Sequence, residues 1–306
     1  MTIPQRPRAQ RGFTLVEAIV AVVIIGIIGA IVAVFIRAPI QGYADSVARA
    51  ETGDEADLAL RRMAREIRLA LPNSVRVSAS GDAIEFLLTK TGGRYLAAED
   101  AVADAAPLDF VDPGKTAFTV VGGLRADVEA GDYVVVYNLG PDMAPADAYR
   151  LNDPARNIAV VKTPVAAGGT TIDLVDNPFA RDDAMPSPGR RFQVVATPVT
   201  FRCAREGGNF VLRRFAGYGI RAAIEDPMPD PRGTLASAVL ARRVSACDGL
   251  FEYELNDAEL RRSALVLLTL GLSTRGAGQA GAADPDADPD AGSVRLVHQV
   301  HVDNTP

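Results

Sequence analysis

One carboxylate, Glu17, stands inside an otherwise apolar run that extends from Phe13 to Ile36. A carboxylate in a membrane helix costs roughly 2.5 to 3.5 kcal/mol near the bilayer centre and less toward the ends, so such residues usually have a partner. If the peptide bond after Gly12 were cut, Phe13 would carry a new ammonium group one helical turn before Glu17, on the same helix face. The two groups could pair within one subunit or between neighbours. We therefore interpret these residues as a processing and assembly site.

The apolar run is long enough to cross a membrane, since a spanning helix needs about 20 predominantly apolar residues. It has no polar face, so every side can meet lipid or another apolar helix. A secretory signal has a shorter apolar stretch and a small-residue cleavage site, which the sequence after Ile36 lacks. A core helix of a soluble protein and a plain signal anchor are the alternatives, and the anchor leaves Glu17 unexplained. The positive-inside rule places Arg6, Arg8 and Arg11 in the cytoplasm and the remainder of the chain across the membrane.

Beyond the apolar run, the pattern predicts that the helix continues as an amphipathic section over residues 40–71. Pro39 permits a kink, and Pro72 ends the helix because the residue before a proline is disfavoured in helical geometry. Apolar residues recur at spacings of three and four, which predicts one buried face. These residues are Ala56, Leu60, Met63, Ile67 and Leu71.

From residue 74 to residue 306, short apolar runs alternate with turn residues, which indicates a β-rich globular domain. A hairpin is predicted at Ser80-Gly81-Asp82, and Leu235–Ala246 is predicted as a short helix. The strands are predicted at Val75–Ser78, Ala83–Thr89, Ala117–Val121, Tyr133–Asn138, Asn157–Lys162, Thr171–Val175, Arg191–Arg202, Asn209–Phe215, Leu250–Leu255, Ala264–Ser273 and Val294–Val302. No strand alternates with a second long helix, so antiparallel sheets are favoured. The expected fold class is α+β, with the helix over residues 13–71 packed on a lobe of antiparallel sheets.

The N-terminal segment Gly12-Phe13-Thr14-Leu15-Val16-Glu17 and the apolar helix that follows resemble the N-terminus of type IV prepilins and type II secretion pseudopilins. The resemblance implies that residues 1–12 are a leader peptide. A membrane prepilin peptidase would cut between Gly12 and Phe13 and methylate the Phe13 amine, and Glu17 would guide assembly.

The same resemblance implies a structural subunit and not an enzyme. Its partners would be other pilins, minor pilins and the inner-membrane assembly platform. The chain would pass once through the bacterial inner membrane, with its globular domain in the periplasm, before it enters a pilus or pseudopilus.

Within this family the chain is most similar to the MshO-type minor pilin of the mannose-sensitive haemagglutinin pilus. The similarity rests on Leu71-Pro72-Asn73-Ser74-Val75-Arg76, on Cys203 with Cys247-Asp248-Gly249, and on Val300-His301-Val302-Asp303-Asn304. A J-type minor pseudopilin of a type II secretion system is the nearest alternative. A binding module displayed at a filament tip is a second alternative and is compatible with either.

Cys203 and Cys247 are the two cysteines of the chain. Both lie on the side expected to face the periplasm, and an even count in an oxidising compartment predicts a disulfide. The alternative, a metal site, lacks ligands. His298 and His301 are the two histidines, and their spacing on a strand would place the rings on opposite faces.

Four carboxylates alternate with small residues and prolines in the tract Asp284, Asp286, Asp288 and Asp290. Calcium binds six to eight oxygen ligands, so the tract resembles the first half of a calcium loop. The distal glutamate of an EF-hand is missing, since the twelfth position counted from Asp284 is Arg295. The composition favours a solvated flexible loop, and calcium binding stays the alternative. No cofactor is expected.

The charge balance disfavours nucleic acid as a partner. The whole chain carries −6, and removal of three leader arginines changes −6 to −9. Phosphate binding requires clustered Lys and Arg. The sequence also contains neither a Gly-x-Ser-x-Gly segment nor a glycine-rich phosphate loop.

Overall fold

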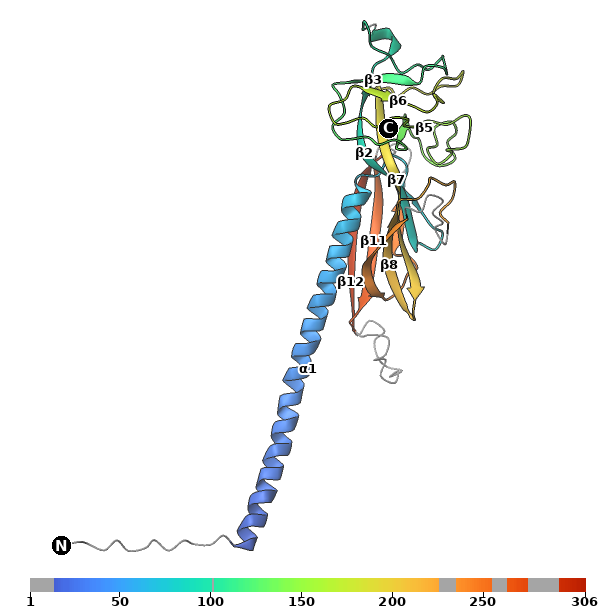
Figure 1. Cartoon of the computed structure of the whole chain (residues 1–306). Coiled ribbons are helices and arrows are strands. Elements are labelled where there is room, and N and C mark those ends of the chain that lie inside the picture. The colour runs from blue at the N-terminus through green and yellow to red at the C-terminus, as the bar shows by residue number, and fades with distance from the viewer. Residues whose placement is uncertain (1–13, 101, 226–234, 255–262, 275–291) are drawn as a thin grey trace, which may run out of the picture. The chain divides into compact units, whose positions relative to one another are not determined.

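The computed structural model describes residues 14–100, 102–225, 235–254, 263–274 and 292–306. The chain divides into two compact units, Met1–Glu51 and Thr52–Pro306. Figure 1 shows helix α1 and the strands of the second unit.

Helix α1 is a single element from Leu15 to Ile67, and Pro39 lies inside it. Among the described residues, one helical stretch is apolar and long enough to cross a membrane, over Leu15–Val32. Its large apolar side chains are exposed within this chain, as expected for a surface that contacts lipid or other apolar helices.

The described strands of the second unit are β1 (Arg76–Val77), β2 (Ala83–Tyr95), β3 (Ala117–Val121), β4 (Tyr133–Val135), β5 (Ile158–Val160), β6 (Thr171–Asp173), β7 (Arg191–Glu206), β8 (Asn209–Ala216), β9 (Ala236–Val244), β10 (Phe251–Glu254), β11 (Ser263–Ser273) and β12 (Ser293–Asp303). A short 3₁₀ helix, η1, covers Ala98–Asp100. The strands join in the order β10-β11-β9-β8-β7-β2-β3-β6, with β12 on β11, β1 on β2, and β4 between β7 and β5. Every pairing between these strands is antiparallel. The predicted α+β class is confirmed.

The C-terminal part of α1 packs on the first of three hydrophobic clusters, which we call the proximal core. The five residues of the predicted apolar helix face are all buried. Four of them, Ala56, Leu60, Met63 and Ile67, pack with inward residues of β2, β7, β8, β11 and β12. On β11, buried and partly buried residues alternate along the strand, which is the pattern of a sheet with one face on a core.

A second cluster, the distal core, holds apolar residues of β3, β4, β5, β6 and the adjoining loops. Between the two lies a junction cluster that includes Leu71, Leu87, Tyr149 and Val195. The long strands β2 and β7 contribute to all three clusters, and Figure 1 shows them passing from the region of β8 to that of β3 and β6. Their pairing shifts register between Leu87 and Thr91, as it passes the junction cluster.

The predicted hairpin is confirmed. β1 pairs with β2, and Gly81 has a φ of +69° at the turn. A Cβ at this position would lie 2.9 Å from the backbone carbonyl oxygen of Phe251. This distance is too short for two non-bonded atoms, so the turn requires glycine. The backbone N–H of Phe251 donates to the carbonyl of Gly81, 2.9 Å away, so the turn is joined to the start of β10.

Two sequence-based assignments are wrong. Leu235–Ala246 is not helical, because Ala236–Val244 forms β9 between β8 and β11. Register shifts in the β8–β9 pairing interrupt the two-residue period, which explains the mixed pattern. The helix ends at Ile67 and not at Leu71, since the N–H of Ala70 bonds back to Ile67 in a tighter turn and Ala70 pairs with Leu88.

Candidate functional site

The N-terminal site begins at the first turn of α1. Gly12 and Phe13, the predicted cleavage position, lie outside the described residues. Glu17 is in the first helical turn, and its side chain is exposed within this chain. The positive N-terminal end of the helix dipole stabilises a carboxylate at this position. Because the side chain is exposed, it is accessible to a neighbouring subunit.

Thr14 is a residue of this site that the sequence-based prediction missed. Its Oγ1 accepts a hydrogen bond from the backbone N–H of Glu17 at 3.3 Å, and its carbonyl accepts from Ala18 at 3.1 Å. Thr14 is therefore the N-cap of α1. The spacing Thr-x-x-Glu is that of a capping box, in which the glutamate can also bond back to the N-cap. This pattern was visible in the sequence. It gives Glu17 a second role, helix capping, besides pairing with the Phe13 ammonium group.

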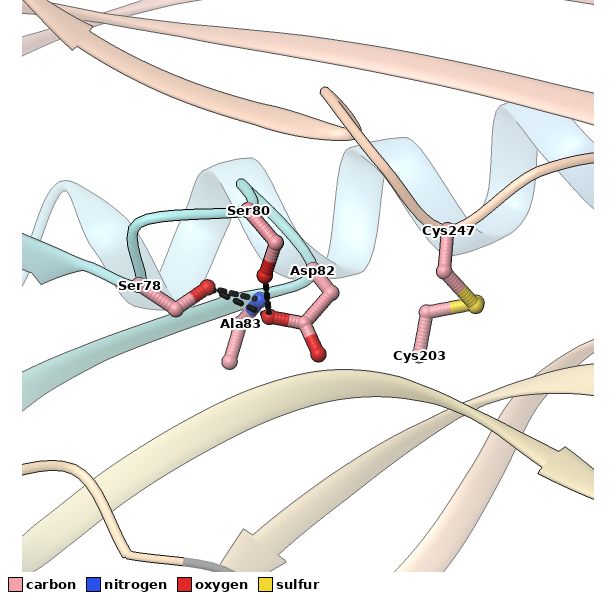
Figure 2. Close-up of a disulfide and its surroundings, with 6 residues drawn as sticks. All are labelled: Ser78, Ser80, Asp82, Ala83, Cys203 and Cys247. Atoms are coloured by element: carbon pink, nitrogen blue, oxygen red, sulfur yellow. Dashed lines mark hydrogen bonds between the residues drawn. A yellow bond between two sulfur atoms is a disulfide. The ribbon is translucent and has the colours of Figure 1, made fainter.

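The predicted disulfide between Cys203 and Cys247 is present. Figure 2 shows it beside the β1–β2 turn. Cys203 lies on β7, Cys247 lies in the segment between β9 and β10, and both are buried. The bond closes the 45-residue loop that contains β8 and β9 and joins this loop to the proximal core. It therefore stabilises the part of the sheet that packs on α1.

Asp82 orders the same turn (Figure 2). Its Oδ1 accepts hydrogen bonds from the hydroxyls of Ser78 and Ser80, and its carbonyl accepts from the N–H of Cys203 at 2.9 Å. Burial raises the pKa of Asp82, but the two serine hydrogen bonds and the charge of Arg202 outweigh burial and leave the pKa below its usual value. The carboxylate thus stays charged and holds the turn against the disulfide-bearing strand.

A second polar group lies on the other face of β2, where Glu85 is buried. Its carboxylate accepts from the Nε of Arg76 at 2.9 Å, from the hydroxyl of Tyr218 at 2.8 Å and from that of Thr200 at 3.1 Å. Arg76 also donates to backbone carbonyls and stacks 3.7 Å above the centre of the Tyr149 ring. Burial, followed by the Glu85 charge, raises the pKa of Tyr218. Because each charged group has several partners, we assign the group to stability and not to catalysis.

The part of the second unit that surrounds the distal core, which we call the distal lobe, contains a cleft of about 730 Å³. Tyr95 and Phe110 form its aromatic wall, with ring centroids 5.7 Å apart. Charged side chains at its rim are paired: Lys115 lies 2.8 Å from Asp109, and Arg190 lies 2.9 Å from Glu99. Aromatic surface with charged groups around it is common in ligand sites. No pattern in the sequence indicated this cleft, since its lining comes from three separated segments.

One loop of the cleft is held by Asn177, a buried residue that the sequence-based prediction also missed. Its Nδ2 donates to the carbonyls of Asp109 at 2.8 Å and of Lys115 at 3.0 Å. The Asp109 carboxylate accepts from Lys115 and from two backbone N–H groups of the same loop. These bonds, led by that of Lys115, lower the pKa of Asp109 to about 2.

The remaining predicted residues contribute no described site. Asp284, Asp286, Asp288 and Asp290 lie outside the described residues, so the calcium alternative stays untested. His298 is partly buried and His301 is exposed on β12, three positions apart and so on opposite faces. Within the described ranges, no three His, Cys, Asp or Glu side chains are grouped as metal ligands.

Comparison with known proteins identifies the N-terminal segment. A family model described as the prokaryotic N-terminal methylation motif matches residues 7–33. No curated protein and no solved structure matches the chain. The matched segment contains Gly12, Phe13 and Glu17 and most of the apolar stretch of α1. The motif implies processing by prepilin peptidase and assembly with other pilins, and together with the apolar helix it fits a membrane-anchored pilin. The chain thus carries, joined to an α+β lobe, the N-terminal signature of the type IV pilin-like proteins.

Proposed function

We propose that this protein is a structural subunit of a type IV pilus, a minor pilin of the MshO type. In this proposal it is cut between Gly12 and Phe13, methylated at Phe13, and assembled through α1 into the filament or its priming complex. The observation that carries the proposal is the methylation motif at residues 7–33, which is continuous with a helix whose apolar side chains are exposed. The large disulfide-bonded lobe supports a periplasmic orientation of the second unit.

The proposal gives Glu17 a charge role in assembly: it pairs with the Phe13 ammonium group. The capping-box geometry at Thr14 offers the competing role of helix capping. Two variants separate these roles. Glu17→Gln retains a side chain able to complete the capping box but removes the charge, whereas Glu17→Ala removes both.

The test is filament incorporation of the two variants in the native host, with N-terminal mass spectrometry of the mature protein. We expect Phe13 with a methylated amine at the mature N-terminus, normal membrane insertion of both variants, and impaired incorporation of both. Normal incorporation of Glu17→Gln with loss for Glu17→Ala would assign Glu17 to capping alone. A mature protein that retains Met1 would remove the processing proposal.

The same host distinguishes a pilus from a secretion pseudopilus. Deletion of the gene should abolish or shorten surface pili and leave protein secretion unchanged. A secretion defect with normal pili would instead identify a J-type pseudopilin.

A second candidate function is ligand binding by the distal lobe. The observation that favours it is the cleft lined by Tyr95, Phe110 and Arg190. Phe110→Ala with Val111→Ala, at two residues of the cleft that are not fully buried, should leave processing and filament incorporation intact while it abolishes adhesion of piliated cells to surfaces. Unchanged adhesion would leave the structural role as the function of the chain.

A further inference from the structure

A pocket of about 580 Å³ is lined by four segments that are far apart in the sequence. They are the turn after α1, the segment after β4, the start of β7 and the residues after β12. We call this pocket the junction pocket. It is separate from the cleft at Tyr95, because Pro188 is the one lining residue that the two have in common. Its volume is that of a small-molecule site.

Arg191 is the only charged side chain among the described residues that line the junction pocket. It is exposed, and no ion pair joins it to a carboxylate of the described residues. The preceding residue, Arg190, is paired with both Glu99 and Asp100. The pocket is therefore a positively charged site on a chain whose net charge is −6. It favours a ligand that carries a negative charge.

The wall of the pocket is held by hydrogen bonds that do not use Arg191. The Nδ2 of Asn73 donates to the carbonyls of Asn138 at 2.9 Å and of Asn304 at 3.1 Å. The backbone N–H of Asn73 donates to the Oδ1 of Asn304 at 3.0 Å, and Asn138 donates to the carbonyl of Pro72 at 2.8 Å. These bonds tie three of the four segments together. The pocket is thus formed before a ligand arrives, which lowers the entropic cost of binding.

Tyr137, which lines the pocket, has a φ of +53°. This left-handed conformation is unfavourable for a bulky residue. The neighbours hold it, since the N–H of Val136 donates to the carbonyl of Asn157 at 3.0 Å and the Nδ2 of Asn157 donates to the carbonyl of Tyr137 at 3.3 Å. Backbone strain of this kind is concentrated at binding and active sites. Here it places an aromatic side chain in the lining of the pocket.

We propose that the junction pocket binds a small organic carboxylate with an aromatic or branched apolar body. Arg191 pairs with the carboxylate, because a planar guanidinium binds a carboxylate through two parallel hydrogen bonds. Tyr137, Leu139 and Met143 line the same pocket and contact the apolar body. A phosphate needs more positive charge than one arginine supplies, and neither a lysine nor a helix N-terminus is among the described lining residues. The inference is independent of the proposed function, since it uses no residue of the N-terminal motif.

The test is titration of the full chain in detergent with 3-phenylpropionate, followed by saturation-transfer NMR. Two further compounds separate the parts of the ligand: 3-phenylpropionamide has the same body without the charge, and acetate has the charge without the body. We expect 3-phenylpropionate to bind at least about tenfold more tightly than either. Inorganic phosphate should bind more weakly than 3-phenylpropionate. Detergent without protein gives the background.

Two variants assign the binding to the pocket. Arg191→Gln should weaken binding of 3-phenylpropionate at least about tenfold and leave binding of 3-phenylpropionamide unchanged. Met143→Ala should weaken binding of both compounds by about twofold to fivefold, because it removes apolar contact surface. Both side chains are exposed, so both variants should keep the urea midpoint of the parent. The matched control is Arg125→Gln, at an exposed arginine between β3 and β4, and it should leave the affinity unchanged.

Equal affinities for the carboxylate and the amide, or for the parent and Arg191→Gln, overturn the inference. So does an equal loss of affinity in Arg125→Gln, which would assign the effect to overall charge and not to the pocket. Tighter binding of inorganic phosphate than of 3-phenylpropionate would refute the assigned ligand class. Absence of saturable binding at millimolar concentrations refutes the site itself.

Discussion

Removal of the Glu85 carboxylate tests whether the buried polar group on β2 stabilises the second unit. The side chains of Glu85 and Arg76 are 2% and 12% exposed. In Glu85→Ala, the Arg76 guanidinium stays buried without its carboxylate, and breaking a buried pair in this way costs about 3 to 5 kcal/mol. Arg76 keeps two backbone carbonyl acceptors and the Tyr149 ring. We therefore expect the lower end, about 3 kcal/mol.

A double variant checks the reasoning. In Arg76→Met with Glu85→Leu both charges are removed, and apolar replacement of a buried pair is often neutral. The hydroxyls of Thr200 and Tyr218 lose their carboxylate but still bond to each other. We therefore expect the double variant to be less destabilised than Glu85→Ala.

The assay is urea unfolding of the full chain in detergent, followed by far-ultraviolet circular dichroism because the sequence contains no tryptophan. A loss below about 1 kcal/mol for Glu85→Ala, or a double variant as destabilised as the sum of its single variants, would refute the charge-burial argument. Asp182→Ala, at an exposed acid between β6 and β7, serves as the control and should change stability by less than about 0.5 kcal/mol.

Three further predictions use the same unfolding assay. Replacing both Cys203 and Cys247 by serine should lower the free energy of unfolding by up to about 4 kcal/mol, the chain-entropy estimate for a loop of this length; an unchanged urea midpoint would contradict it. Met63→Ala should cost about 2 to 5 kcal/mol because the side chain is fully buried in the proximal core, whereas Leu58→Ala on the exposed face should cost little. Asp109 has a pKa of about 2 in the fold, against 3.8 as the ordinary value. Its contribution is therefore complete above about pH 4 and lost as pH falls through about 2, so the stability difference between the parent and Asp109→Asn should shrink over that range; a difference that does not change with pH would argue against it.

The sequence predicted those features that depend on local pattern. The apolar stretch follows from its length and composition. The buried face from Ala56 to Leu71 and most strands follow from periodicity, because a residue's position in a helix or strand determines which face it occupies. The disulfide followed from cysteine count and compartment, since the chain offers one pairing. The methylation motif lies in consecutive residues, and comparison with known proteins recovers it.

Long-range pairing decided the remainder. The sequence pattern around Val239 and Ala241 fits both a helix and a strand. The segment forms strand β9 because β8 and β11 supply hydrogen-bonding partners on both sides. Local propensity is a weak prior that such pairing overrides. The helix end at Ile67 was likewise set by the contact between Ala70 and Leu88.

The candidate sites divide in the same way. Glu17 and its neighbours could be assigned from sequence, because a charge in an apolar helix is conspicuous without any tertiary contact. The Glu85 group and the distal cleft could not, since they need distant segments. Arg76 meets Glu85 across the local β1–β2 hairpin, but Thr200 meets it only when β2 and β7 pair, and Tyr218 reaches it from the segment after β8. The sequence by itself thus determined the anchor and its processing signal, which are local. Tertiary structure alone decided which polar side chains share a buried environment, because burial and partner geometry arise only from packing of the whole lobe.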